Sequence, residues 1–433
     1  MKVYNGTAVC IRKLHSCWVM PIVVHKVLTM VIIFVALASV YLYNDALPAQ
    51  SLERDQATWR SQLSYLDGIY YLRLARDWYS PGDEVCAFYP LWPWLIRTAS
   101  PFFGGDLLVT GLLLASCFSV AGMFLFYELV AKQAGEDIAE RSLILLAAFP
   151  GAIFFSLLYT ESLFFFLSML FFHGLFRQRM WMTCLSGFLL PMTRAVGIFI
   201  LLPLVWHLFW RGWRRWATGN GPTSAHGAVE IAEKAISEET TFKKHAPRWL
   251  NATPALKRFC DLLMCLAAQR LWLGLMAILA GYASYLAIMF FATGNPFEGF
   301  SAQRKFPALA SVANIVNLGK FWRSFRNVGA VHGQLDSAID RMLFLLFLAT
   351  LPKVWRLDRS YFFYVLGMGL LPVLSNGFMS YTRFVELCFP MFIVLAGWLA
   401  GPTKRLLLWY YVALAAVTQG VFLIRNINFH WAG

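Results

Sequence analysis

The chain has 433 residues, of which 59% are hydrophobic and only 14% charged, and its mean hydropathy is +0.58. A soluble domain is closer to half apolar and a quarter charged, so this composition excludes an ordinary soluble protein and predicts an all-α, polytopic membrane protein. The formal charge of +14 does not indicate nucleic-acid binding, because the basic residues stand between apolar runs, as they do in cytoplasmic loops.

The first apolar run, residues 27–43, follows a basic N-terminal segment. It could be a signal peptide, but we favour a retained first helix because the run extends back through residues 18–24. The basic flank places the N-terminus in the cytoplasm, so residues 44–105 are expected to form a first external loop. External here means periplasmic in a bacterium or lumenal in a eukaryote.

The centre of this loop is the stretch 65–93, which is too charged and too rich in proline to cross a bilayer. It starts near Asp67 and ends in an aromatic–proline run, 88–93. Apolar residues at helical spacing over 70–78 predict an amphipathic helix that either lies in the membrane interface or packs on the helix bundle. We expect the loop to present Asp67 as a catalytic base at the membrane boundary.

After a spanning segment at 106–131, the apolar run 142–176 is too long for one crossing. As a single helix it would be about 50 Å long, whereas the hydrocarbon core is about 30 Å thick. Because both of its ends are charged, it predicts two helices that meet outside at 149–162, with a polar tip at 156–162.

The next apolar run, 181–210, has basic residues at both ends and a single internal charge, Arg194. An arginine inside hydrocarbon costs about 2.5–3.5 kcal/mol on the insertion scale, so we expect a second broken pair of helices that turns at 191–194 and places Arg194 outside.

The rest of the chain continues the alternation between apolar and hydrophilic segments. Residues 211–270 predict a cytoplasmic loop, and residues 293–337 predict a second external loop after an outward crossing at 271–292. Further crossings are expected at 341–351, 361–374, 384–400 and 406–424. The whole chain, 1–433, is therefore predicted to be one membrane domain with about eleven crossings.

This topology gathers polar side chains on the external face. The set comprises Asp67, Glu84, Tyr159, Glu161, Arg194, Arg304, Lys305, Tyr381 and Arg383. Charges near membrane segments are functional candidates, because hydrocarbon penalises them otherwise. The sequence has neither clustered histidines nor HExxH spacing, so we expect no metal and no cofactor.

Carboxylates and guanidinium groups at the lipid boundary suit displacement at a carbon that bears a phosphate leaving group. Asp67 would take the proton from the attacking hydroxyl, while Arg194, Arg304 and Arg383 would neutralise the departing phosphate. Each arginine could instead be an interface anchor, and Glu161 could simply pair with one of them.

Several stretches together resemble the GPI mannosyltransferase 2 family. They are Asp67 in the first loop, AFYPLWP at 87–93, SLLYTES at 156–162 and RAVG at 194–197. The resemblance covers about residues 60–200 and implies a type C glycosyltransferase that is metal-independent and uses a polyprenyl- or dolichyl-phosphate sugar. Leu66 replaces the tryptophan that this family has before the aspartate, which bears on the identity of donor or acceptor.

The predicted function is an inverting transfer of mannose, or a similar hexose, from that donor to a hydroxyl of a glycolipid or glycan. Substrate-orienting roles are expected for Glu161, Tyr159, Glu84, Tyr381 and Lys305. The alternative is a transporter or flippase of a lipid-linked sugar, which usually has two-fold internal symmetry that this sequence does not show. We favour a bacterial inner membrane over the endoplasmic reticulum.

Overall fold

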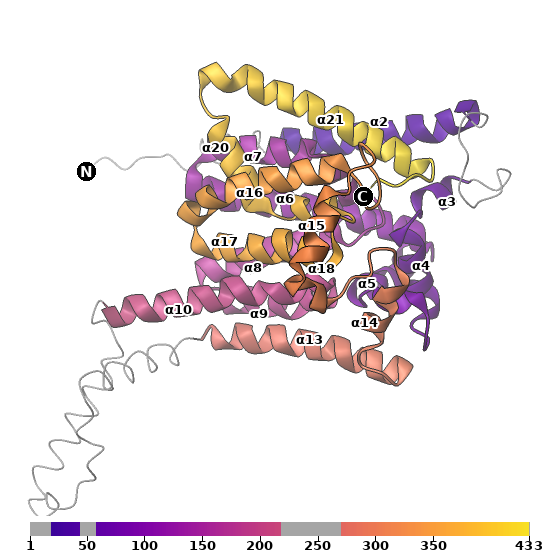
Figure 1. Cartoon of the computed structure of the whole chain (residues 1–433), viewed down its shortest axis with the longest axis horizontal. Helices are drawn as coiled ribbons and strands as arrows, with labels where there is room; N and C mark the ends of the chain where they lie inside the picture. The colour runs from indigo at the N-terminus through magenta and orange to yellow at the C-terminus, as the bar shows by residue number, and fades with distance from the viewer. Residues whose placement is uncertain (1–18, 44–57, 218–269, 433) are drawn as a thin grey trace, which may run out of the picture.

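The structure is a computed structural model that describes residues 19–43, 58–217 and 270–432 (Figure 1). Within these ranges the regular elements are all helical, apart from an isolated bridge between Ala330 and Ser337. The longest helices lie roughly side by side, and short helices gather at the right-hand end in the figure. The prediction of an all-α membrane protein is confirmed.

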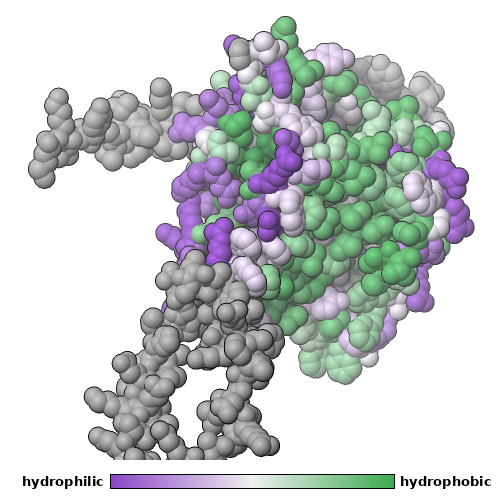
Figure 2. All heavy atoms as spheres, turned by 60° about the vertical axis from the view of Figure 1, so that its left-hand side comes forward, coloured by the Kyte–Doolittle hydropathy of each residue, from purple (hydrophilic) through white to green (hydrophobic). Residues whose placement is uncertain are grey.

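Five stretches among the described residues are long and apolar enough to span a membrane. They are Val19–Ala38 in α2 (Val19–Tyr43), α6 (Leu107–Ala134), Ala195–Arg214 in η6 (Ala195–Ile200) and α10 (Leu201–Ala217), α13 (Trp272–Thr293) and α21 (Arg405–Ile427). Figure 2 shows hydrophobic side chains over a broad surface, with hydrophilic residues along its edges. Large apolar residues such as Phe34 and Phe291 point outward, as expected of side chains that face lipid.

Both predicted helix breaks are present. Helix α7 (Glu136–Ala148) ends just before Pro150, and a short 3-10 segment, η4 (Pro150–Phe155), leads toward α8 (Glu161–Arg177). A proline disfavours helical geometry in the residue before it, which explains the stop. The second break follows α9 (Met180–Leu189), where η5 (Leu190–Met192) contains Pro191. The helices therefore break at 149–160 and at 190–194, close to the predicted breaks at 149–162 and 191–194.

The C-terminal part of the bundle consists mainly of shorter helices. They are α16 (Ala338–Leu357), α17 (Arg359–Val365), a π-helical turn (Leu366–Leu370), α18 (Leu371–Asn376), α19 (Tyr381–Glu386) and α20 (Phe389–Trp398). Helix α8 is buried along almost its whole length among its neighbours. Because several of these helices are too short to span a bilayer alone, the count of about eleven crossings stays a prediction.

The two predicted external loops form a layer of short helices at one end of the bundle. The first contributes α3 (Trp59–Leu63), α4 (Asp67–Asp77), η2 (Glu84–Ala87), α5 (Leu91–Ala99) and η3 (Ser100–Phe103). The second contributes α14 (Glu298–Ala302), η8 (Gln303–Lys305), η9 (Val312–Val316) and α15 (Leu318–Arg326).

These two loops are joined by hydrogen bonds. The side chain of Gln303 donates to the Ala87 carbonyl at 3.0 Å, and the Gly82 amide donates to Glu298 at 3.1 Å. Helix α4 buries Tyr71, Leu74 and Ala75, so its apolar face packs against the protein. Most of the predicted cytoplasmic loop, residues 218–269, lies outside the described residues.

Candidate active site

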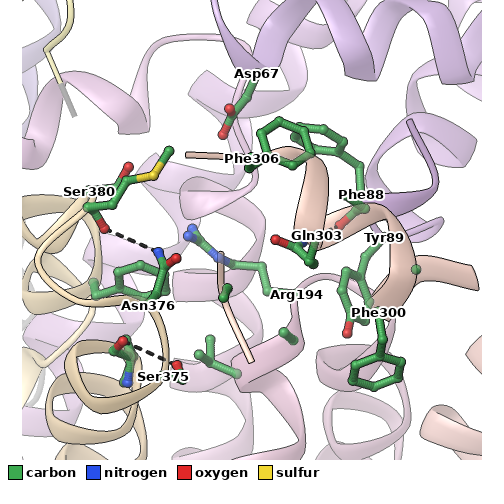
Figure 3. A pocket seen from close by; sticks show the side chains of 18 of the residues that line it. Asp67, Phe88, Tyr89, Arg194, Phe300, Gln303, Phe306, Ser375, Asn376 and Ser380 are labelled. Atoms are coloured by element: carbon green, nitrogen blue, oxygen red, sulfur yellow. Dashed lines mark hydrogen bonds between the residues drawn. The ribbon is translucent and has the colours of Figure 1, made fainter. Parts of the chain in front are cut away.

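A cavity of about 490 Å³ opens in the layer of short helices (Figure 3). Asp67, Arg194, Arg304 and Arg383 all line it, so the predicted base and the three predicted phosphate-binding arginines share one space. Asp67 lies in α4 and Arg194 in the break that follows η5. Arg304 lies in η8 and Arg383 in α19. Asp67 and Arg383 are 316 positions apart in the chain. Tertiary packing therefore builds the cavity from segments that are remote in sequence.

Asp67 is the first residue of α4. A carboxylate at a helix N-terminus is stabilised by the backbone amides that point toward it. The preceding residue, Leu66, has φ 58° and ψ −124°, a backbone conformation that non-glycine residues rarely adopt. This turn sets the direction in which α4 starts. The side chain of Asp67 is 27% exposed, so a substrate can reach it.

Arg383 connects the two carboxylates of the site. Its Nη1 donates to Asp67 Oδ2 at 2.7 Å, and its Nε donates to Glu161 Oε1 at 2.5 Å. The guanidinium plane lies over the rings of Tyr159 and Phe154, at 4.6 and 5.1 Å from their centroids. With two carboxylates and two aromatic faces around it, the Arg383 side chain has little freedom to change position.

Glu161 anchors a second arginine through the same oxygen. Arg194 Nη1 lies 2.6 Å from Glu161 Oε1, and its guanidinium is 5.1 Å from the ring of Phe384. The Glu161 side chain is fully buried, and its Oε2 has no hydrogen-bond partner among the described residues. A buried carboxylate needs opposite charge beside it, which the two guanidinium groups supply.

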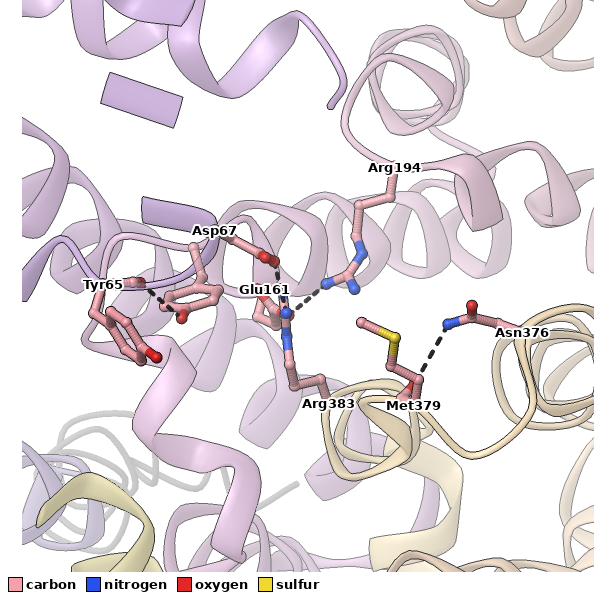
Figure 4. Close-up of polar contacts among 8 residues, drawn as sticks. Tyr65, Asp67, Glu161, Arg194, Asn376, Met379 and Arg383 are labelled. Atoms are coloured by element: carbon pink, nitrogen blue, oxygen red, sulfur yellow. Dashed lines mark hydrogen bonds and ion pairs between the residues drawn. The ribbon is translucent and has the colours of Figure 1, made fainter. Parts of the chain in front are cut away.

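The four side chains Asp67, Arg383, Glu161 and Arg194 therefore alternate negative and positive charges in a connected row (Figure 4). Glu161 lies behind the cavity wall, and Asp67, Arg194 and Arg383 face the cavity. Arg304 also faces it from an exposed position, and within the described part of the chain its guanidinium has no ion pair. This arrangement can accept an additional anion.

The predicted orienting residues take different places. Tyr159 is buried beneath Arg383, and its hydroxyl donates to the Tyr65 carbonyl at 3.2 Å. Tyr381 is also fully buried and packs against Phe344 and Phe378, with ring centroids 5.7 and 5.9 Å away. Neither tyrosine lines the cavity.

Glu84 and Lys305 line a second, more open pocket of about 410 Å³ on the surface. There the Lys305 ammonium donates to the Gly82 carbonyl at 2.5 Å, and Arg73 pairs with Asp83. The structure thus separates Glu84 and Lys305 from Asp67.

Sequence reasoning missed much of the cavity wall. Aromatic side chains form one part of it: Tyr71, Phe88, Tyr89, Tyr285, Phe300, Phe306 and Phe384. Tyr89 stacks on Tyr285 at 4.3 Å between centroids. Burial, followed by the nearby Asp67 charge, raises the pKa of the Tyr71 phenol, so Tyr71 stays neutral.

Polar groups on the opposite wall come from α18 and its surroundings: Ser375, Asn376 and Ser380. Gln303, from η8, lines the cavity on the side of Phe88 and Tyr89 (Figure 3). The pair Ser375–Asn376, directly after the apolar run 361–374, is the signal that could have found this wall. Among the described residues, no three histidine, cysteine, aspartate or glutamate side chains come together in a way that could hold a metal ion.

No model of a known protein family matches the sequence, and no curated protein matches it. Three solved structures of the Archaeoglobus fulgidus oligosaccharyltransferase are similar to the chain. The apo form gives a TM-score of 0.44 at 15% identity, and covers 94% of this chain and 56% of the archaeal chain.

The form tethered by a disulfide to an acceptor peptide with the NVT sequon gives a TM-score of 0.43 at 15% identity. The match covers 94% of this chain and 55% of the archaeal chain. The complex with zinc and sulfate gives a TM-score of 0.39 at 14% identity. The match covers 80% of this chain and 45% of the archaeal chain. The chain thus spans about half the length of the archaeal protein.

Proposed function

We propose that the protein is a type C glycosyltransferase that moves a hexose from a polyprenyl- or dolichyl-phosphate donor to a hydroxyl of a glycolipid or glycan. The observation that carries the proposal is the shared cavity, in which one reachable carboxylate, Asp67, faces three arginines. Its volume of about 490 Å³ lies within the range of small-molecule sites, about 300–1,000 Å³.

In the proposed reaction, Asp67 accepts the proton of the acceptor hydroxyl as its oxygen attacks the anomeric carbon of the sugar. The bond between that carbon and the phosphate oxygen breaks on the opposite side, which inverts the configuration. The electron pair leaves with the polyprenyl phosphate, and Arg194, Arg304 and Arg383 neutralise its charge.

The arginines are suited to this role because their positions are fixed in advance. Glu161 holds Arg194 and Arg383 through one oxygen, at 2.6 and 2.5 Å, so they converge without having to be ordered by the substrate. We assign Glu161 and Tyr159 to orienting these cations. We propose that Glu84 and Lys305 contact a part of the substrate remote from the bond that breaks.

The choice of mannose and of an external reaction face rests on the motif resemblance and on the basic residues between the apolar runs. A bacterial inner membrane is favoured, with the endoplasmic reticulum as the alternative. Cysteines introduced beside Asp67 and Arg356 and treated with a membrane-impermeant thiol reagent test the sidedness. Labelling from outside beside Asp67 only is the expected result.

The decisive assay for the proposed activity uses the purified full chain with radiolabelled polyprenyl-phosphate mannose and a pool of membrane glycolipids. Appearance of label in an acceptor supports the transferase. Binding of the donor without any transfer, together with its movement across a vesicle membrane, would support the carrier instead. The position of the charged row at one end of the bundle favours the transferase, because carriers bind substrate near the midplane.

A further inference from the structure

The start of helix α19, which carries Arg383, is not fixed by interactions within the helix. It contains six residues, and the preceding Ser380 has φ 58° and makes no capping hydrogen bond with its side chain. The first amides of any helix lack partners within the helix, and so short a helix is not stable by itself. The position of α19 must therefore be set by groups outside it.

Asp340 on the neighbouring helix α16 supplies such a group. Its Oδ1 accepts hydrogen bonds from the Thr382 amide at 3.0 Å and from the Thr382 hydroxyl at 2.6 Å. Asp340 is fully buried in the first turn of α16, where its own amide donates to the cap residue Ser337 at 3.2 Å. Both ends of this connection are thus held in place.

The adjacent cation does not neutralise Asp340 through an ion pair. The Arg341 guanidinium instead donates to backbone carbonyls, among them Ser337 at 2.6 Å and Ser324 at 2.7 Å. Among the described residues, Asp340 Oδ2 has no hydrogen-bond partner. Burying a carboxylate in this way is costly. The contact of Asp340 with Thr382 is therefore better explained by a requirement for position than by a gain in stability.

We propose that Asp340 is a positioning residue of the site, which acts through Thr382 to place Arg383. Tyr381 supports the same placement, since it packs on Phe344, one turn further along α16. With both contacts made, the Arg383 guanidinium reaches Asp67 and Glu161 at once. This inference rests on the proposed function, in which Arg383 binds the donor phosphate.

The most selective test is Thr382→Val, which removes the hydroxyl but leaves the backbone hydrogen bond to Asp340. Misplacement of a binding group by about 1 Å can cost up to about a hundredfold in rate, so we expect kcat/KM for polyprenyl-phosphate mannose to fall about ten- to a hundredfold. The KM for the donor should rise while the KM for the acceptor stays unchanged. A purely structural role would lower the active fraction and leave both KM values as they are.

Conservative variants distinguish a positioning role of these side chains from a general effect on folding. Thr382→Ser keeps the hydroxyl, and Asp340→Asn keeps an oxygen that can accept both hydrogen bonds, so each should retain most of the activity. Asp340→Ala should lose it as Thr382→Val does. Thr350→Val is the matched control, because it removes a buried hydroxyl on α16 that is bonded to the Phe347 carbonyl at 2.7 Å and lies about 15 Å from Asp340 along the helix.

Two outcomes are distinguishable by adding Arg383→Gln to the series. If Arg383→Gln is inactive while folded Thr382→Val and Asp340→Ala keep the donor KM and kcat of the unaltered protein, the positioning role is overturned and the proposed function stands. If Arg383→Gln is fully active, the role of Arg383 is overturned and the positioning role of Asp340 with it, whereas absence of any transfer by the unaltered protein would overturn the proposed function itself.

Discussion

Arg383 Nη1 lies 2.7 Å from Asp67 Oδ2, so the proposed phosphate ligand and the proposed base are hydrogen-bonded to each other. An Nη group carries two N–H donors, so Arg383 Nη1 can bond Asp67 and still offer a hydrogen to a donor phosphate. Because Glu161 and two aromatic rings hold the Arg383 side chain, we expect it to keep its position when the phosphate binds. The contact thus places a phosphate-binding cation directly beside the proposed base.

Replacing Asp67 by asparagine should abolish transfer without unfolding the protein. The amide cannot take a proton from the acceptor, and loss of a general base typically costs about 10²–10⁴-fold in rate. The measurement is initial transfer rate per folded protein, with Asp77→Asn, at the exposed end of the same helix, as the matched control. Turnover of Asp67→Asn near that of Asp77→Asn would falsify the base assignment.

Replacing Arg383 by lysine should be nearly as harmful as replacing it by glutamine. Lysine keeps the charge but lacks the planar fork that bonds Asp67 and Glu161 simultaneously. We expect donor affinity, measured by equilibrium binding of polyprenyl-phosphate mannose, to fall in both variants. The exposed Arg356→Lys is the control and should bind normally. Normal donor binding by Arg383→Lys would show that charge alone suffices.

Replacing Glu161 by glutamine should destabilise the protein as well as inactivate it. The buried carboxylate offsets two guanidinium groups, and breaking a buried ion pair typically costs about 3–5 kcal/mol. Glu128→Gln breaks two partly exposed pairs, with Arg177 at 3.0 Å and with Lys132 at 3.9 Å, and should cost about 1 kcal/mol or less. Thermal unfolding of both variants in one detergent checks the difference, and equal midpoints would contradict it.

Replacing Gly151 by alanine should lower stability by displacing η4 from α19. A Cβ at this position would lie 2.6 Å from Glu386 Oε2 and 3.0 Å from the Thr382 carbonyl, and such overpacking typically costs about 1–3 kcal/mol. At Gly397 in α20 a Cβ would meet nothing within 4 Å, so Gly397→Ala should be neutral or slightly stabilising. Thermal midpoints that reverse this order would refute the packing argument.

Local features of the sequence predicted the helical membrane architecture and the positions of its helix breaks. The lengths of the apolar runs and the charges at their ends located the helix breaks, which the structure contains at Pro150 and Pro191. These features depend only on hydrophobic length and backbone geometry, which neighbouring residues determine. The same pattern placed Asp67 and Arg194 in breaks between apolar segments.

The direction of each side chain was decided by tertiary packing. Tyr381 and Arg383 are two positions apart on α19, and residues at that spacing face nearly opposite sides of a helix. Packing of α19 against α16 therefore buries Tyr381 and turns Arg383 toward Asp67. Arg304 and Lys305 are likewise neighbours that face two different pockets.

The sequence by itself determined that this is a helical membrane protein and where its helices break, because those properties follow from local composition. Only the tertiary structure decided that one oxygen of Glu161 binds two arginines and that Asp340 bonds Thr382. Contacts between residues so far apart depend on how whole helices pack against one another. A linear pattern of residue types does not carry that information.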